Sequence, residues 1–392
     1  MCPTEMPLRY GINPHQKPAR VFMRQGQLPF KALNGSPGFI NLMDLLNGWQ
    51  LVSELREATG LPAAASFKHV SPAGAAVAVP MSPEVAMASF ADDIELTPLA
   101  TAYARARGAD RMSSFGDAIA LSDPCDAATA RFIRREVSDC VIAPGYEPES
   151  LEILRRKSDG RYLVVEIDPD YKPAPLEARD VFGITLEQPR NDYRVTDAMF
   201  ANVVTKRKEM PPHARRDMIV ATIALKYAQS NSVCFACDGQ VIGLGAGQQS
   251  RVHCVRLAGA KADLWRLRQH PAVLGLKFGE SAGRAERNNA IDQLLTDGLK
   301  DPFAGNKWKE LFTARPHRLS AAEKREWLAA KRGVTLSSDA FFPFRDSIDR
   351  AAESGVEYVL EPGGSTRDDL IIDAADEYDM VMAFSGIRLF HH

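Results

Sequence analysis

Short apolar runs alternate with longer stretches of helical periodicity along most of this chain, and this alternation constrains the fold more than any other feature. Short apolar runs are typical of buried strands, and apolar residues three and four positions apart are typical of amphipathic helices. We expect strands at 117–121, 139–143, 162–167, 233–237, 241–244, 357–360 and 380–384. We expect helices at 127–137, 148–156, 213–228, 248–267, 344–354 and 366–377. This order predicts an α/β architecture.

The chain also repeats itself. The segment 113–154 resembles the segment 337–372 in four features that follow in the same order: Ser-Ser with Asp-Ala, a helix, a strand ending in Pro-Gly, and a second helix. The two Pro-Gly corners are Pro144-Gly145 and Pro362-Gly363. Such an internal repeat predicts two similar α/β halves.

The length of 392 residues favours two packed units, because a single core stops growing at roughly 250 to 300 residues. The Pro-rich segment 168–175 is linker-like. We therefore predict a first domain at 1–185 and a second at 186–392. Residues 268–332 are mostly helical in pattern and highly charged, with Trp308 and Trp327 as packing anchors, so we interpret them as a helical insertion in the second domain.

Composition excludes several classes of protein. The chain is 45% hydrophobic and 25% charged with a formal net charge of -2, which gives no electrostatic case for binding nucleic acid or an anionic membrane. No apolar run is long enough to span a bilayer, and the start of the chain has no secretory signal pattern. The six cysteines are scattered, as in proteins with reduced thiols. We expect a cytoplasmic protein.

Lys68 and His69 stand side by side after an apolar run, directly before Ser71-Pro-Ala-Gly74. Neighbours on a strand face opposite sides, so both can serve one site only where the strand ends, and we predict a turn at 71–74 that ends it. An imidazole can take a proton near neutral pH, and an ammonium can stabilise charge developing on an oxygen. A surface lysine and a hydrogen-bonded core histidine are the ordinary alternative.

A second motif covers residues 226–254. Asp238-Gly239 between two apolar runs predicts a hairpin turn. The glycines between Gly243 and Gly247 lead from a strand into a helix, where they would let a ligand approach the backbone, although a tight turn without a ligand fits equally. Their spacing matches neither a dinucleotide fingerprint nor an ATP-binding loop. Cys234 and Cys237 form a C-x-x-C pair, but the H-x-E of zinc deaminases is missing, which argues against zinc.

Both ends of the chain carry polar and aromatic residues. The segment LRYGINPHQ at 8–16 contains Arg9 and Tyr10, and the chain ends GIRLFHH with Arg388 and Phe390. An Arg and a Phe in an apolar context indicate a docked terminus, whereas the last two histidines also fit a tag remnant.

Together, LRYGINPHQ, SFKHVSPAGAAV, SSFGDAIALSD, QSNSVCFACDGQVIGLGAGQQSR, FFPFRDSIDRA and RLFHH resemble one family. The chain is similar, from about Leu8 to His392, to the transformylase half of the bifunctional enzymes that combine AICAR transformylase with IMP cyclohydrolase. The resemblance implies two tandem cytidine-deaminase-like, three-layer domains with an inserted helical subdomain. It also implies a homodimer with active sites at the subunit interface.

The resemblance further implies formyl transfer from 10-formyltetrahydrofolate, as cosubstrate, to the 5-amino group of AICAR in purine biosynthesis. By similarity, His69 takes the amine proton, Lys68 supports the formyl oxygen or the departing folate nitrogen, and Asn231 holds the formyl group. No catalytic metal is needed for this reaction.

The substrate contacts are carried over position by position. For AICAR, Arg9 and Arg388 pair with the phosphate with help from Tyr10, Phe390 packs on the imidazole, and Asn41 of the other subunit binds the carboxamide together with Phe115 and Gly116. For the folate, Asp139 accepts hydrogen bonds from the pterin, and the pocket is lined by Met112, Arg251, Val252, Asn289, Phe341 and Pro343.

Two departures from the family pattern matter. The chain starts within a few residues of the transformylase domain, so we expect a separate IMP cyclohydrolase in the pathway. Ala228 stands where the family pattern has a threonine beside a potassium site, which puts a monovalent cation in doubt. Two other functions stay open: a zinc-dependent, deaminase-like hydrolase, which predicts bound zinc, and a non-catalytic AICAR-binding protein, which predicts loss of Lys68, His69 or Asn231, all of which are present.

Overall fold

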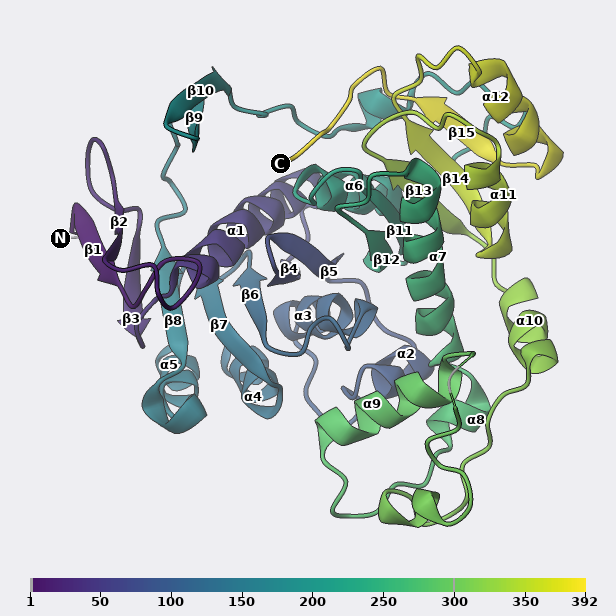
Figure 1. Ribbon diagram of the computed structural model, residues 1–392, viewed down its shortest axis with the longest axis horizontal. Coiled ribbons are helices and arrows are strands. Elements are labelled where there is room, and N and C mark those ends of the chain that lie inside the picture. The colour runs from purple at the N-terminus through teal and green to yellow at the C-terminus, as the bar shows by residue number, and fades with distance from the viewer. Residues whose placement is uncertain (1–2, 299) are drawn as a thin grey trace.

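An eleven-stranded mixed sheet runs through the whole molecule and confirms the predicted α/β class (Figure 1). The structure is a computed structural model that describes residues 3–298 and 300–392. The strand order is β15-β14-β13-β11-β12-β5-β4-β6-β7-β8-β3. Two antiparallel pairs, β1-β2 and β9-β10, lie outside this sheet.

The first part of the chain builds one half of the sheet. Its elements are β3 (Phe30–Asn34), α1 (Phe39–Thr59), β4 (Ala63–Lys68), β5 (Ser71–Val77), α2 (Pro83–Ala88), α3 (Pro98–Ala109), β6 (Asp117–Leu121), α4 (Ala127–Arg135), β7 (Ser138–Ala143), α5 (Pro148–Arg155), η1 (Lys157–Gly160) and β8 (Leu163–Ile167). Before them stand β1 (Glu5–Leu8) and β2 (Ala19–Phe22).

The second part repeats this order. Its elements are α6 (Pro212–Lys226), β11 (Val233–Cys237), β12 (Gln240–Gly245), α7 (Arg251–Leu267), β13 (Val334–Ser338), α11 (Asp346–Glu353), β14 (Val356–Glu361), α12 (Asp368–Glu377) and β15 (Val381–Phe384). Between the two parts lie β9 (Leu176–Val181), β10 (Ile184–Pro189) and η2 (Asp197–Phe200). Both parts thus run helix, antiparallel hairpin, helix, and then three parallel strands joined by two helices.

The repeat seen in the sequence lies in these parallel strands. Pro144-Gly145 follows β7 and Pro362-Gly363 follows β14, as expected. The Ser-Ser elements, however, are not equivalent, because Ser113 precedes β6 whereas Ser337 lies inside β13. The division into two domains stays a prediction, since strands of both parts join in one sheet.

Helices cover both faces of the sheet. α1 and α6 share one core cluster with residues of both halves, and α3, α4, α7, α11 and α12 pack on the opposite face. Successive residues of β6 alternate between the two sides: Ala118 and Ala120 pack under α1, and Ile119 and Leu121 pack under α3 and α4. Burial on both faces explains why these strands read as continuous apolar runs.

The predicted insertion at 268–332 contains α8 (Pro271–Leu274), α9 (Arg284–Leu295), η3 (Lys307–Glu310) and α10 (Ala321–Ala329). These elements lie to one side of the sheet (Figure 1). Trp327 packs against α7 and α8 and donates its indole N–H to the carbonyl of Arg266 at 2.8 Å. Trp308 packs in a second small cluster with Phe312.

The periodicity did not predict every element. α1, α3 and β13 are among those that were not expected, and the turn expected at 71–74 is wrong because these residues begin β5. Pro72 pairs with Phe67, and the register of the pairing shifts between Phe67 and Ser66. A proline is tolerated at such an irregular position because it has no N–H to donate to the ladder. No helix among the described residues is both long and apolar enough to cross a lipid bilayer.

Candidate active site at one edge of the sheet

Strand pairing brings distant parts of the first half to one edge of the sheet. β4 ends at this edge with Lys68, and its antiparallel neighbour β6 begins there, directly after Gly116. β7 runs parallel to β6 and begins at the same edge, with Asp139 as its second residue. Residues up to 71 positions apart in sequence, from Lys68 to Asp139, therefore meet at one edge.

The second half contributes to the same edge. β11 begins two residues after Asn231, and Val233 pairs with Ser338 at the end of β13. β12 pairs with β5 and joins the two halves. The backbone N–H of Gln229 donates to the hydroxyl of Ser71 at 3.2 Å, so the loop before β11 touches the start of β5. Lys68 and Asn231 therefore belong to neighbouring segments of one edge.

The turn between β4 and β5 consists of His69 and Val70, which confirms that the strand ends at Lys68. Both turn residues have left-handed backbone conformations, with φ of 53° and 60°. This conformation is uncommon for a residue with a side chain and a genuine outlier for a β-branched one such as Val70. The matching turn of the second half is the ordinary Asp238-Gly239. The first turn thus keeps an exposed histidine where Asp-Gly would fit the backbone better.

Asp44 of α1 holds this turn, and the sequence analysis missed it. Its buried carboxylate accepts a hydrogen bond from the backbone N–H of Val70 at 2.6 Å. Burial raises the pKa of Asp44, and the Val70 hydrogen bond and the nearby charge of His69 oppose that rise. Its signal in the sequence is an aspartate inside the apolar run 42–46.

Lys68 contacts the loop before β6. Its ammonium donates to the carbonyl of Phe115 at 2.5 Å. Gly116 has a φ of 73°, and a Cβ on it would stand 3.6 Å from a carboxylate oxygen of Asp139. Burial and the charge of Asp117 raise the pKa of Asp139, while Lys68 and Arg9 lower it. Four predicted site residues, Lys68, Phe115, Gly116 and Asp139, are therefore close neighbours.

Arg9 and Asn41 meet at the start of α1. The Arg9 guanidinium donates to the side-chain oxygen of Asn41 at 3.4 Å, and that oxygen also accepts from the backbone N–H of Gly38 at 3.1 Å. Tyr10 lies beside Arg9, with 5.9 Å between the guanidinium carbon and the ring centroid. The structure brings these three predicted residues together within one chain; the prediction that Asn41 serves another subunit stays a prediction.

Arg251 connects the predicted residues of the second half. At the start of α7, its guanidinium donates to the side-chain oxygen of Asn231 at 3.0 Å and to Asp339 at 2.5 Å. Asp339 is fully buried and also accepts from the hydroxyl of Ser230 and the N–H of Ser232. Asp339 therefore fixes both Arg251 and the loop before β11. Sequence reasoning missed it, although an aspartate directly after a buried strand is a usable signal.

The carboxyl-terminal tail is docked at this edge, as predicted. The backbone of His391 exchanges two hydrogen bonds with Ser230, each at 3.0 Å, and the N–H of Leu389 donates to the carbonyl of Asp339. Arg388 and Phe390 are exposed and lie against each other, with the guanidinium carbon 4.5 Å from the ring centroid. Two predicted AICAR contacts thus stand beside the Asn231 loop.

The remaining predicted folate contacts lie near Arg251 and Asp339 or on the loop before β6. Val252 follows Arg251 at the start of α7, and Phe341 and Pro343 follow Asp339. Met112 contacts α9 through Asn288, whose amide lies 3.1 Å from the methionine sulfur. The predicted neighbour Asn289 is exposed instead. The large apolar side chains of Met112, Phe115, Phe341 and Phe390 are all exposed, as is typical of ligand contacts.

The glycines of β12 do not form a ligand loop. A Cβ on Gly243 would stand 2.1 Å from the carbonyl oxygen of Ala258, and one on Gly245 would stand 2.4 Å from that of Cys254. Both glycines therefore let α7 pack closely on the strand, which at these two positions favours the alternative without a ligand. A cavity of about 330 Å³ lies elsewhere, between α1 and residues 194–197, and no predicted site residue lines it.

The C-x-x-C pair is buried in β11. Burial raises the pKa of the Cys237 thiol to about 11, and burial also raises that of Cys234 well above its usual value. Thiolates, not thiols, bind zinc, so these side chains are poor ligands near neutral pH. Across residues 3–298 and 300–392, no three His, Cys, Asp or Glu side chains gather closely enough to hold a metal ion.

Residues 2–261 match the family model of the AICARFT/IMPCHase bienzyme. The chain belongs to the AICARFT/IMPCHase family. The family model covers Lys68, His69, Asn231 and Arg251, whereas Arg388 and Phe390 lie beyond it.

Curated relatives in the AICARFT/IMPCHase family extend the match. The bifunctional purine biosynthesis protein PurH of Cereibacter sphaeroides is 34% identical over 390 residues, which cover 98% of this chain and 59% of that protein. The protein of the same name from Rhizobium rhizogenes is 34% identical over 389 residues, with 98% and 58% covered. The chain therefore spans less than two thirds of the length of these relatives.

Proposed function

We propose that this chain transfers a formyl group from 10-formyltetrahydrofolate to the 5-amino group of AICAR, giving formyl-AICAR and tetrahydrofolate. The observation that carries the proposal is the edge of the sheet where Lys68, His69 and the Arg251-bound Asn231 stand together. Family membership supports the reaction, since relatives are named for purine biosynthesis.

The chemistry requires a base and a partner for an oxyanion. The amine nitrogen of AICAR forms a bond to the formyl carbon, and the bond from that carbon to the folate nitrogen breaks. His69 accepts the proton that the amine loses, and the folate nitrogen gains a proton on leaving. Lys68 stabilises the negative charge that develops on the formyl oxygen. Asp44 accepts from the backbone N–H of Val70 and so holds the turn that presents His69.

Asn231 supplies an amide that can hold the formyl group. Because its side-chain oxygen accepts from Arg251, its NH₂ group is the part left to donate to an oxygen. Arg251 is itself held by Asp339 and the carbonyl of Ser232. Asn231 is therefore oriented before substrate arrives, which is the condition for efficient transition-state stabilisation.

The exposed groups around this centre fit the two substrates. Guanidiniums bind phosphate bidentately, so we assign Arg9 and Arg388 to the phosphate of AICAR, with Tyr10 beside Arg9. Phe390 packs on the imidazole, and Asn41, Phe115 and Gly116 contact the carboxamide. The folate site takes Asp139 for the pterin, and its pocket is lined by Met112, Arg251, Val252, Asn289, Phe341 and Pro343.

The proposal is tested by mixing purified protein with AICAR and 10-formyltetrahydrofolate and following tetrahydrofolate spectrally. We expect formyl-AICAR as the product. Formation of IMP as well would contradict the expectation of a separate cyclohydrolase. Binding of AICAR without turnover would replace the proposal by the AICAR-binding alternative.

We also infer a homodimer, and the β9-β10 hairpin indicates where a second copy binds. The hairpin extends away from the body of the protein (Figure 1). Its pairing puts the exposed apolar residues Val181, Ile184 and Leu186 on one face, with Arg179 opposite Leu186, and puts Asp180, Thr185 and Leu176 on the other. A two-stranded ribbon is marginally stable alone, and an apolar face on it favours a protein partner.

The dimer is tested by light scattering during size-exclusion chromatography. The double variant Ile184→Asp, Leu186→Asp is expected to shift the molecular mass from dimer to monomer, because it places charge on the apolar face. Thr185→Asp is the control on the opposite face. A double variant with the mass of the wild-type dimer would remove the hairpin from the interface, and a monomeric wild type would exclude the dimer.

A further inference from the structure

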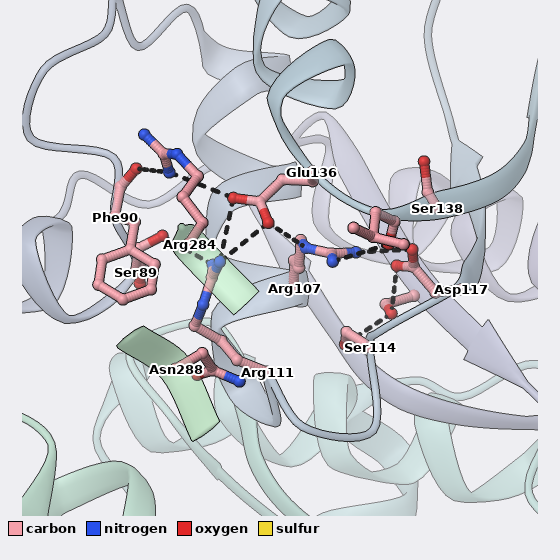
Figure 2. A network of polar contacts seen from close by, with 12 residues as sticks. Ser89, Phe90, Arg107, Arg111, Ser114, Asp117, Glu136, Ser138, Arg284 and Asn288 are labelled. Carbon is pink, nitrogen blue, oxygen red and sulfur yellow. Dashed lines mark hydrogen bonds and ion pairs between the residues drawn. The ribbon is translucent and has the colours of Figure 1, made fainter. Parts of the chain in front are cut away.

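A buried network of charges lies beneath the loop 110–116, which joins α3 to β6 and carries Met112, Phe115 and Gly116 (Figure 2). Arg107 donates to Asp117 at 2.6 Å and to Glu136 at 3.1 Å. The network continues from Asp117 through the hydroxyl of Ser66 to that of Ser114.

Most residues of the loop 110–116 are held by residues outside the loop. Asp110 pairs with Lys261 of α7 at 2.9 Å, and Ser114 bonds to Ser66 of β4 at 2.8 Å. At its far end the carbonyl of Phe115 accepts from Lys68, and the N–H of Gly116 donates to the carbonyl of Val137. The backbone is therefore fixed while two apolar side chains, Met112 and Phe115, stay exposed at 39% and 50%. Such an arrangement is preorganised to contact a ligand.

Glu136 is the centre of the network. Its carboxylate accepts two hydrogen bonds from Arg111, at 2.9 and 3.0 Å, besides the bond from Arg107. Burial opposes its ionisation, but the Arg111 and Arg107 guanidiniums outweigh burial and hold the pKa of Glu136 below its ordinary value. Loss of this carboxylate would remove the ion-pair partner of the buried Arg111, whereas Arg107 would keep its pair with Asp117.

The helical segment 268–332 enters the network through α9. Arg284 donates to the carbonyl of Phe90 at 3.0 Å and to Glu136 at 3.4 Å (Figure 2). Asn288, one turn later on the same face, contacts the sulfur of Met112 and accepts from Arg268 at 2.7 Å. α9 thus holds the loop from two positions, once through Glu136 and Arg111 and once directly at Met112.

We propose that Arg284 is a positioning residue, which acts through Glu136 to hold α9 against the loop 110–116 and so sets the affinity for the formyl donor. The proposal rests on the proposed function, in which Met112 contacts the folate. α9 reaches the loop at Met112, whereas the two AICAR contacts on the same loop, Phe115 and Gly116, are held by Lys68 and by the carbonyl of Val137. The other AICAR contacts, Arg9, Tyr10 and Arg388, lie on other elements. Loss of Arg284 should therefore weaken binding of the formyl donor and leave binding of AICAR nearly unchanged.

The test uses Arg284→Gln, because Arg284 lies at the rim of the network with a side chain 27% exposed. The matched control is Arg287→Gln on the same helix, since Arg287 donates to the carbonyls of Ala282 and Gly279 and lies over the Phe278 ring, all within the same segment. We expect the KM for 10-formyltetrahydrofolate to rise five- to tenfold in Arg284→Gln, with the KM for AICAR and kcat within twofold of wild type. Arg284→Lys should recover part of the loss.

Hydrogen exchange tests the anchoring without any assay of turnover. Amides of residues 111–113 are expected to exchange at least tenfold faster in Arg284→Gln than in wild type or Arg287→Gln. Unchanged exchange would overturn the proposal, and so would a rise in both KM values or a fall in kcat alone. A wild-type protein without formyl transfer would contradict the proposed function instead, and exchange would still decide whether Arg284 anchors the loop.

Discussion

His69 and Val70 occupy a turn whose backbone favours glycine and asparagine, and the corresponding turn of the second half contains Asp238-Gly239. A left-handed conformation at two residues with side chains costs of order 1–3 kcal/mol each. Asp44 offsets part of this cost by accepting from the N–H of Val70. The chain thus retains a strained turn at the point where it presents an imidazole.

Replacing His69 by alanine is expected to lower turnover at least 100-fold while AICAR binding stays within a few-fold, because general base catalysis contributes about 10² to 10⁴. Steady-state kinetics and AICAR titration measure the two effects. His213→Ala, at an exposed position at the start of α6, is the control. Near-normal turnover of His69→Ala would exclude His69 from the mechanism.

Glu361 is a buried carboxyl at the end of β14. One of its oxygens accepts from the N–H of Phe342 at 2.5 Å, and the other has no hydrogen-bond partner among the described residues. Burial raises its pKa from 4.5 to about 8. Between these values the folded chain binds more protons than the unfolded chain, so the free energy of unfolding falls as pH rises through this window.

We expect Glu361→Gln to be more stable than wild type at pH 8 by a few kcal/mol, and about equal at pH 4.5, because an amide stays neutral. Denaturant unfolding at several pH values measures the difference. Glu353→Gln, exposed at the end of α11, provides the comparison. Parallel pH profiles for wild type and Glu361→Gln would contradict this prediction.

At the scale of elements, the two hairpins are built alike. Asp44 and Asp217 are each the sixth residue of a helix, and each accepts from the turn of the following hairpin. Gly74 and Gly243 are each the fourth residue of the second strand, and a Cβ on either would stand 2.1 Å from a helix carbonyl oxygen, that of Ala106 in α3 for Gly74 and that of Ala258 in α7 for Gly243. This repeat cannot be recognised in the sequence, because the residues between the aspartate and the glycine differ in the two halves.

Gly243→Ala should therefore lower the free energy of unfolding by about 3 kcal/mol, since the backbone of α7 has no room to move aside. Thermal denaturation monitored by circular dichroism measures the loss. In Gly247→Ala the new Cβ meets nothing within 4 Å, and only its φ of 66° is unfavourable, so a loss of about 1 kcal/mol is expected. Equal stability of the two variants would contradict the close packing of α7.

At the scale of the whole molecule, the two halves share a sheet and a core. Strands β5 and β12 join the halves, and Arg105 of α3 reaches across to Gln240 at 3.0 Å. The largest core cluster includes residues of both α1 and α6. Neither half can separate without exposing this core.

We accordingly predict one cooperative transition in differential scanning calorimetry, with the calorimetric enthalpy equal to the van't Hoff enthalpy. Two resolved transitions would show that the predicted domains 1–185 and 186–392 unfold independently. The measurement is made with the dimer-disrupting hairpin variant as well, so that dissociation of subunits is not mistaken for a domain transition.

The sequence by itself determined the α/β class, most parallel strands and their helices, the Asp238-Gly239 turn and the docked tail. These features follow from local burial periodicity and turn chemistry, which a short window of residues contains. The pattern also singled out Lys68 and His69, whereas Asn231 and Arg251 were predicted only from the resemblance to a family. Only the tertiary structure decided that 71–74 is a strand, that Gly243 serves helix packing, and that Asp44, Asp339 and Glu136 hold the site. Each of these depends on which strands pair and how closely a helix approaches them, and such long-range contacts leave no periodic trace in a single sequence.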